Sequence, residues 1–318
     1  MAGDEPVESL EGLGEFAVID KLLSGRVQPP SVVLGPGDDA AVVAASDGRT
    51  VVSTDMLVEG RHFRLDWSTP HEVGRKSIAA NAADIEAMGA VATAFVAAFG
   101  APGDTAADDV TALSDGMWRE AGKIGAGIVG GDLVSAPQWV ISVTALGDLQ
   151  GREPVVLGGA RVDHVVAVTG ELGWSAAGYA LWSNGVRGFE QLRLRHLVPE
   201  PPYGQGAIAA DAGATAMTDV SDGLVADLGH VARASGVGID LSWDALAFDH
   251  DAVAAAAAAL HMDPRVWVLG GGEDHALVAT FPGPAPSGWR VIGRVIEGPS
   301  RVLLDGERWH GDAGWQSF

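Results

Sequence analysis

The sequence predicts a mixed α+β and α/β fold organised as two domains. Its 318 residues amount to about two domains at roughly 150 residues each. Strand-like and helix-like segments mix in both halves without the regular strand–helix–strand repeat of a doubly wound sheet. Residues 147–163 are rich in glycine and charge and lack apolar periodicity. We therefore place the domain boundary in this segment and expect domains at 1–148 and 149–318.

The N-terminal half starts with an expected helix at 11–23, where apolar side chains fall on one face. A second helix should begin at Pro70 and reach about Met88, because Thr69 is a good N-cap and Glu72 completes a capping box. The other elements expected in this half are strands at 31–34, 40–44, 50–54, 91–99, 128–129 and 139–146, and a helix at 104–123.

The C-terminal half restarts with a buried strand at 164–168, after the boundary segment. Its expected elements are a further strand at 215–218 and helices at 174–183, 203–212, 222–234 and 252–260.

Composition excludes several functions. The 42 acidic residues outnumber the 20 basic ones, and the net charge of −22 argues against binding to a nucleic-acid backbone. The absence of cysteine removes disulfides, thiolate metal sites and cysteine nucleophiles. No long apolar segment predicts a membrane helix, and no basic and then apolar signal segment opens the sequence. We therefore expect a cytoplasmic protein with no membrane or nucleic-acid partner.

The common phosphate-binding loops are also absent. The segment 35–40 has GxGxxA spacing, but two aspartates stand where a pyrophosphate would approach, and a strand follows. The GxGxxG at 125–130 follows a helix and precedes a strand, which is the wrong order. None of the three lysines lies in a GxxxxGK[ST] motif. Any phosphate chemistry must therefore use other residues.

Several aspartates lie beside glycine, serine or threonine, and we expect most of them in turns directly after strands. Any one such aspartate is more simply explained as a backbone cap. Asp84 is harder to explain in this way, because the middle of a helix suits neither a cap nor an aspartate. Taken together, these oxygen-rich turns favour a multi-metal phosphate site, since Mg²⁺ prefers carboxylate and phosphate oxygens. The group comprises Asp38, Asp39, Asp55, Asp84, Asp132, Asp219, Asp222, Glu273 and Asp274.

These residues occur in motifs that resemble those of the thiamine-monophosphate kinase family, within the aminoimidazole-ribonucleotide-synthetase-like ATP-binding superfamily. The resemblance runs from Gly14 to Trp315 in the order of the family. Each motif alone is weak, and the ordered set is specific. The motifs are GDDA at 37–40, STDMLVEG at 53–60, HF at 62–63, NAADIEAMG at 81–89, GGD at 130–132, DVSDGL at 219–224 and GGED at 271–274.

The resemblance implies an N-terminal α/β domain whose sheet pairs with that of a second subunit, a C-terminal α+β domain and a homodimer. It implies phosphorylation of thiamine monophosphate by ATP with several Mg²⁺ ions. The metal ligands that it implies are Asp39, Ser53, Thr54, Asp55, Asp84, Asp132, Asp219 and Asp222, of which Asp39, Asp84 and Asp219 are expected to be catalytic. The residues expected at ATP are Gly131, Asp132 and Ser221. The residues expected at thiamine monophosphate are His62, Glu273 and Trp315.

The sequence departs from the family pattern at one position, and two alternative functions stay open. Leu157 stands where the family often has an arginine that contacts ATP, so Arg152 or Arg161 could supply that contact. A purine-biosynthesis ligase of the same superfamily is the nearest alternative function. A non-catalytic acidic protein that binds Ca²⁺ is the alternative from a different class, although the sequence has no DxDxDG calcium loop.

Overall fold

A computed structural model describes residues 9–36, 40–311 and 314. The chain folds into two compact units. Unit 1 comprises Met1–Asn81 and Ala92–Gly147, and unit 2 comprises Ala82–Val91 and Asp148–Phe318. The short segment 82–91 thus belongs with the C-terminal residues, and it carries Asp84.

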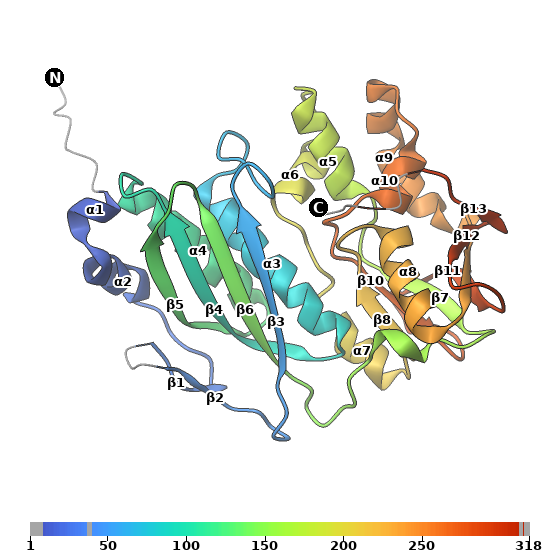
Figure 1. Ribbon diagram of the computed structural model, residues 1–318, viewed down its shortest axis with the longest axis horizontal. Helices are drawn as coiled ribbons and strands as arrows, with labels where there is room; N and C mark the ends of the chain where they lie inside the picture. The colour runs from blue at the N-terminus through green and yellow to red at the C-terminus, as the bar shows by residue number, and fades with distance from the viewer. Residues whose placement is uncertain (1–8, 37–39, 312–313, 315–318) are drawn as a thin grey trace. The chain divides into compact units, whose positions relative to one another are not determined.

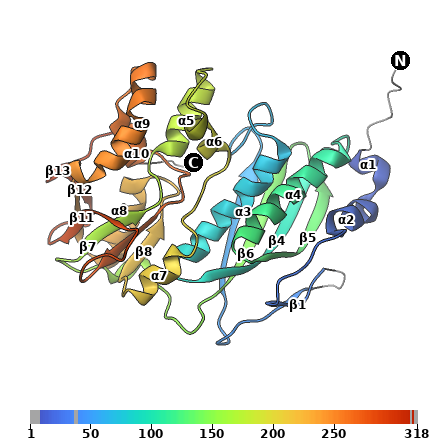
Figure 2. The same cartoon turned by 180° about the vertical axis from the view of Figure 1, so that it is seen from behind.

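Unit 1 is built on a four-stranded sheet of order β3-β6-β4-β5, in which β3 pairs antiparallel with β6 and β4 pairs parallel with β5. Helices α3 and α4 lie on one face of this sheet, as both ribbon views show (Figures 1 and 2). The elements are α1 (Leu10–Leu13), α2 (Glu15–Leu23), β1 (Val32–Leu34), β2 (Val42–Val43), β3 (Val51–Val58), α3 (Pro70–Ala87), β4 (Val91–Ala101), α4 (Ala107–Lys123), β5 (Gly127–Ser135) and β6 (Val140–Asp148).

The capping box confirms the predicted start of α3. The Glu72 N–H donates to Thr69 Oγ1 at 3.3 Å, and the Thr69 N–H donates to Glu72 Oε2 at 2.8 Å. A glycine lets α3 approach α4 closely, since a Cβ on Gly74 would lie 2.0 Å from the Leu113 carbonyl oxygen. These local features fix where the helix that carries Asp84 begins and how it packs.

Two expectations about unit 1 were wrong. The single helix expected at 11–23 is broken into α1 and α2 at Gly14, whose φ is 80°. Asp55 and Asp132 were expected in turns after strands, but they lie inside β3 and β5. Both strands extend beyond their apolar runs because the backbone ladder pairs residues whatever their hydrophobicity; β3, for example, stays paired with β6 as far as Val58.

Unit 2 contains a seven-stranded sheet of order β13-β12-β9-β11-β7-β10-β8, in which only the β12–β9 pair is parallel. Its elements are η1 (Leu157–Gly159), β7 (Val165–Thr169), α5 (Trp174–Ser183), α6 (Glu190–Leu197), α7 (Gln205–Asp211), β8 (Ala216–Asp219), α8 (Leu224–Ser235), β9 (Gly238–Leu241), η2 (Asp244–Leu246), α9 (Ala247–Leu260), α10 (Pro264–Gly270), β10 (Leu277–Phe281), β11 (Arg290–Ile296), β12 (Val302–Leu304) and β13 (Glu307–Arg308).

Both faces of this sheet are buried. On β7, Val166 and Val168 join one apolar cluster with residues of α5, α8, α9 and α10. The intervening Ala167 points to the other face, where Ala209 of α7 and Ala87 at the end of α3 pack. Helices therefore cover the sheet on two sides, and the mixed fold class predicted from the sequence is confirmed.

The sequence missed helices α6 and α10, which are seven or eight residues long. Such short helices are stabilised by packing, which a local apolar pattern does not reveal. Among the helices of the described ranges, none combines the length and apolarity that crossing a bilayer would require.

Candidate functional site

The predicted residues of unit 2 gather where β8 ends. Asp219 is the last residue of β8, and a loop of four residues leads from it to α8. Asp227, in the first turns of α8, turns back toward this loop. Its Oδ2 accepts the backbone N–H groups of Ser221, Asp222 and Gly223 at 3.0, 3.1 and 3.0 Å. The loop that presents Asp219 and Asp222 is thus tied to one buried carboxylate.

A second glycine-containing loop, at 270–275, packs on the first. The Glu273 N–H donates to the Ser221 carbonyl at 2.8 Å, and the His275 N–H donates to the Val220 carbonyl at 2.9 Å. A Cβ on Gly272 would lie 2.4 Å from the Ser221 carbonyl oxygen, so this approach requires glycine. Glu273 and His275 both have left-handed backbones, with φ of 62° and 53°.

His275 connects the acidic residues of this region. Its Nδ1 lies 2.9 Å from Asp219 Oδ2, and both residues are buried. Burial lowers the pKa of His275, but the hydrogen bond to Asp219 and the charge of that carboxylate outweigh it, and the pKa is raised. The carboxylates of Asp84 and Glu273 raise it further, so three acidic side chains act on one imidazole.

The carboxylates are close enough to perturb one another. Burial raises the pKa of Asp222, His230 lowers it, and the charge of Asp219 raises it. Burial raises the pKa of Asp227 to about 7, although the Gly223 N–H that it accepts opposes this shift. Ligand atoms of Asp222, Asp227 and His230 lie within 4.8 Å of one another. Of these groups, Asp222 and the nearby Asp219 offer the carboxylate oxygens that a hard divalent cation such as Mg²⁺ prefers, whereas Asp227 Oδ2 already accepts three backbone N–H groups.

Glu273 stands beside a polar cluster on α5 and α6. His196 Nδ1 lies 3.5 Å from Glu273 Oε2 and 3.3 Å from Ser175 Oγ, and His196 is buried. The neighbouring Asp274 accepts the N–H groups of Gly173 and Ser175 at the start of α5, and burial raises its pKa to about 7. His196 was not predicted from the sequence, because it lies on the unpredicted helix α6.

In unit 1, the predicted residues of β3 divide between the two faces of the sheet. Ser53 and Asp55 pair with buried residues of β6, and the Asp55 N–H donates to Asn81 Oδ1 on α3 at 3.1 Å. Thr54 points to the opposite face, because side chains alternate along a strand. Its Oγ1 accepts a hydrogen bond from Thr144 at 3.1 Å and donates to the Val143 carbonyl at 3.0 Å.

Gly131 and Asp132 lie in the middle of β5. A Cβ on Gly131 would lie 2.0 Å from the Ala97 carbonyl oxygen of β4, so the pairing of the two strands already requires glycine here. Asp132 is exposed, and its Oδ1 accepts the Leu133 N–H at 3.0 Å.

His62 lies in the turn after β3, where its Nδ1 accepts the Val58 N–H at 3.0 Å and its carbonyl accepts Lys76 Nζ at 2.9 Å. Arg152, one of two candidates to replace the arginine that is missing at Leu157, is paired with Asp211 at 2.8 Å. Asp38, Asp39 and Trp315 lie outside the described residues.

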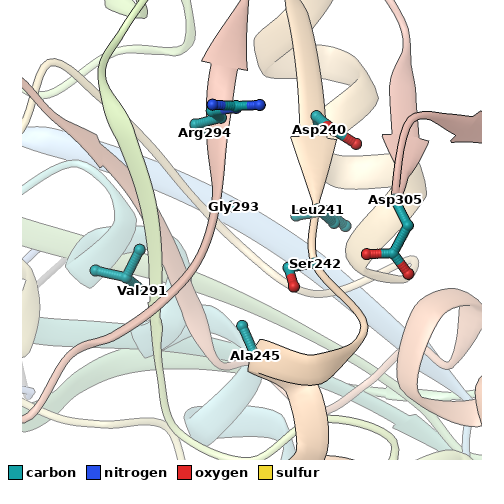
Figure 3. Close-up of a pocket in the computed structure, with 8 residues that line it drawn as sticks. All are labelled: Asp240, Leu241, Ser242, Ala245, Val291, Gly293, Arg294 and Asp305. Atoms are coloured by element: carbon teal, nitrogen blue, oxygen red, sulfur yellow. The ribbon is translucent and has the colours of Figure 1, made fainter.

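A surface hollow of about 290 Å³ lies elsewhere in unit 2, and none of the predicted residues lines it (Figure 3). Asp240 there accepts the Gly306 N–H at 2.9 Å, and Asp305 accepts the Trp243 N–H at 3.2 Å. Both carboxylates thus stabilise turns, and this hollow contains none of the residues predicted for the site.

Comparison with known proteins identifies the family that the chain resembles. Two family models match, AIR synthase related protein, N-terminal domain, at 37–149 and its C-terminal domain at 161–305. A curated thiamine-monophosphate kinase of Mycobacterium tuberculosis (strain CDC 1551 / Oshkosh) is 70% identical over 310 residues, which cover 98% of this chain and 93% of the relative.

Among solved structures, AaThiL complexed with AMPPCP and TMP is 30% identical with a TM-score of 0.78, and the match covers 99% of this chain and 100% of that one. The hydrogenase maturation protein HypE is 17% identical with a TM-score of 0.72, over 90% of this chain and 93% of that one, and shares the fold alone.

Proposed function

The chain belongs to the thiamine-monophosphate kinase family, and from this premise we propose that it transfers the γ-phosphoryl group of ATP to thiamine monophosphate. The products are ADP and thiamine diphosphate. The observation that carries the proposal is the gathering of Asp219 and Glu273 around His275 on two interlocked loops of unit 2, where the charge of Asp84 on α3 also acts on His275. Both substrates are anions, so an acidic site can hold them only together with cations.

We propose several Mg²⁺ ions as these cations. The donor atoms are the carboxylate and hydroxyl oxygens that Mg²⁺ prefers. When bound, Mg²⁺ screens the phosphate charges and lowers the repulsion between the two substrates. The residues proposed to hold them are Asp39, Ser53, Thr54, Asp55, Asp84, Asp132, Asp219 and Asp222, of which Asp39, Asp84 and Asp219 are also proposed to be catalytic. Thr54 would contribute through its main chain, because its hydroxyl points to the opposite face of β3 from Ser53 and Asp55. On β3, Ser53 and Asp55 share one face, so their side chains can serve one ion together.

The two substrates are proposed to bind to different sets of residues. Gly131, Asp132 and Ser221 are assigned to ATP, and His62, Glu273 and Trp315 to thiamine monophosphate. Glu273 is held by its N–H on the Ser221 carbonyl and faces His196, which keeps its carboxylate beside the loop. A carboxylate and an aromatic ring suit the positively charged thiazolium of this substrate.

We propose that the transfer is direct and in line, with no phosphoenzyme. The acceptor is a phosphate monoester, whose second pKa is about 6, so it is ionised at neutral pH and needs no general base. The protein then has to align two anions and neutralise their charge. A chiral γ-phosphate should emerge with inverted configuration, and retention of configuration would refute direct transfer.

Product analysis separates this function from its alternatives. We expect ADP release that depends on thiamine monophosphate, with thiamine diphosphate as the second product by mass spectrometry. Release that requires formylglycinamidine ribonucleotide instead would identify a purine-biosynthesis ligase. Tight Ca²⁺ binding without any turnover would identify an acidic binding protein.

We further propose a homodimer in the cytoplasm, where its co-substrate ATP is held. On β3, Val52 and Met56 point away from α3 and α4 and are 59% and 53% exposed. Apolar side chains on an uncovered sheet face suit contact with a second copy. Sedimentation should show a dimer, and the variant Met56→Glu should be monomeric; a monomeric parent protein would refute this proposal.

A further inference from the structure

Three consecutive backbone N–H groups of the loop at 221–223 point at one atom. This atom is Oδ2 of Asp227, which the three groups reach at 3.0 to 3.1 Å. Successive N–H groups that converge in this way form an anion-binding concavity, which in many proteins holds a phosphate. Here the anion is a carboxylate of the chain itself.

An ordinary helix cap does not explain the arrangement. An N-cap side chain precedes its helix and accepts N–H groups of the first helical turn, and in a capping box a first-turn side chain accepts only the N–H of the N-cap residue. Asp227 lies inside α8 and reaches back to three residues that precede the helix. Gly223, the N-cap residue, has no side chain and a φ of 139°. The carboxylate therefore orders the loop.

Backbone carbonyl groups of the loop also form hydrogen bonds. The Val220 and Ser221 carbonyls accept the His275 and Glu273 N–H groups. The N–H groups at 221–223 are therefore unavailable to phosphate oxygens, and the loop presents side chains to its surroundings. These side chains include the carboxylate of Asp222, and the carboxylate of Asp219 lies just before the loop, at the end of β8; both suit cations.

We propose that Asp227 is a positioning residue for divalent-cation binding. It fixes the loop at 221–223 and, through it, the separation of the Asp219 and Asp222 carboxylates. This inference rests on the proposed function, in which these two carboxylates hold Mg²⁺. Asp227 contributes through the loop and makes no contact with the substrates.

The test measures Mn²⁺ binding to the full-length protein by titration calorimetry, with the metal alone. Asp219→Asn serves as the reference variant: the Mn²⁺ ions whose binding it weakens are the ions that the loop holds. In Asp227→Ala, the affinity for these Mn²⁺ ions should fall by about 10-fold to 100-fold, which is the usual effect of removing a residue that orients metal ligands. Asp227→Asn keeps one acceptor oxygen and should bind with intermediate affinity. In turnover assays, the Mg²⁺ concentration for half-maximal rate should rise by a similar factor, while kcat at saturating Mg²⁺ changes less than about 3-fold.

Asp249→Asn is a matched control. It makes the same substitution at an equally buried aspartate, whose partner is Arg290 on β11. It should lower stability and leave Mn²⁺ affinity unchanged. If Asp227→Ala does not fold, Asp227→Asn alone decides the test.

Unchanged Mn²⁺ affinity in the folded Asp227 variants would overturn the proposal, as would an equal loss in Asp249→Asn or a parent protein that does not bind Mn²⁺. A parent protein that binds Mn²⁺ at Asp219 but does not phosphorylate thiamine monophosphate would refute the proposed function and leave this inference standing.

Discussion

Replacement of Gly131 by alanine should destabilise unit 1 even in the absence of any ligand. The added Cβ would lie 2.0 Å from the Ala97 carbonyl oxygen, whereas real Cβ contacts are never so short. Ala97 is the direct partner of Gly131 in the parallel ladder of β4 and β5. The obstacle is therefore main chain in a paired strand, and β5 can relieve the clash only by moving away from β4.

The size of the effect follows from this geometry. Overpacking a core costs about 1–3 kcal/mol when side chains can adjust. Here main chain has to move, so we expect at least the upper end of that range, about 3 kcal/mol. A change of 1 kcal/mol lowers Tm by about 2–4 °C in domains of 150–250 residues. The Tm of Gly131→Ala should therefore fall by about 6–12 °C.

The neighbouring residue offers a control with the same substitution. A Cβ on Gly130 would meet no atom within 4 Å, so Gly130→Ala should change stability by no more than about 0.5 kcal/mol. Differential scanning calorimetry of both variants without nucleotide or metal measures the contrast. A Tm of Gly131→Ala within 2 °C of the parent protein, or an equal fall in both variants, would refute the steric argument.

Three other changes have defined outcomes. Because burial raises the pKa of Asp274 to about 7, the folded form holds a proton that the unfolded form releases near pH 4, so stability is lost as pH rises. In urea unfolding, Asp274 should contribute a loss of about 1.4 kcal/mol per pH unit between pH 5 and 7, beside a similar contribution from Asp227, and Asp274→Asn should remove only the first. An unchanged slope in Asp274→Asn would contradict the assignment. Arg290 donates to the buried Asp249 carboxylate at 2.8 and 3.0 Å, and Arg290→Leu removes this cation. The free energy of unfolding should fall by about 3–5 kcal/mol in the same experiment. A fall below about 1 kcal/mol would show that Asp249 is neutral. Asp84→Asn should abolish turnover with the Tm of the metal-free protein nearly unchanged, and a large fall in Tm would make Asp84 structural.

Much of the fold could be predicted from local sequence. The capping box at Thr69 and Glu72 set the start of α3, and α5 was predicted at the residues it occupies. Helices α6 and α10 could not be predicted, because their few residues are held by packing. It also could not be predicted that Asp55 and Asp132 lie inside strands, since the partner strand determines where a strand ends.

The candidate site was predictable in its residue types and less so in its geometry. The spacing of Asp219, Asp222 and Glu273 was visible in the sequence, and the resemblance gave these residues their roles. The parts played by Asp227 and His275 were not visible. Both depend on loop backbones, with Gly223 at a φ of 139° and His275 at 53°, and no short sequence pattern specifies such conformations. That Thr54 faces away from Ser53 and Asp55 follows from alternation once the strand is known.

We propose that this acidic site uses Mg²⁺ to phosphorylate thiamine monophosphate with ATP. The most direct measurement follows ADP and thiamine diphosphate together over a titration with Mg²⁺. We expect the two products in equal amounts, with a rate that rises with Mg²⁺ and vanishes when a chelator removes it. Thiamine diphosphate formed at full rate in the chelator, or ADP released without thiamine diphosphate, would contradict the account.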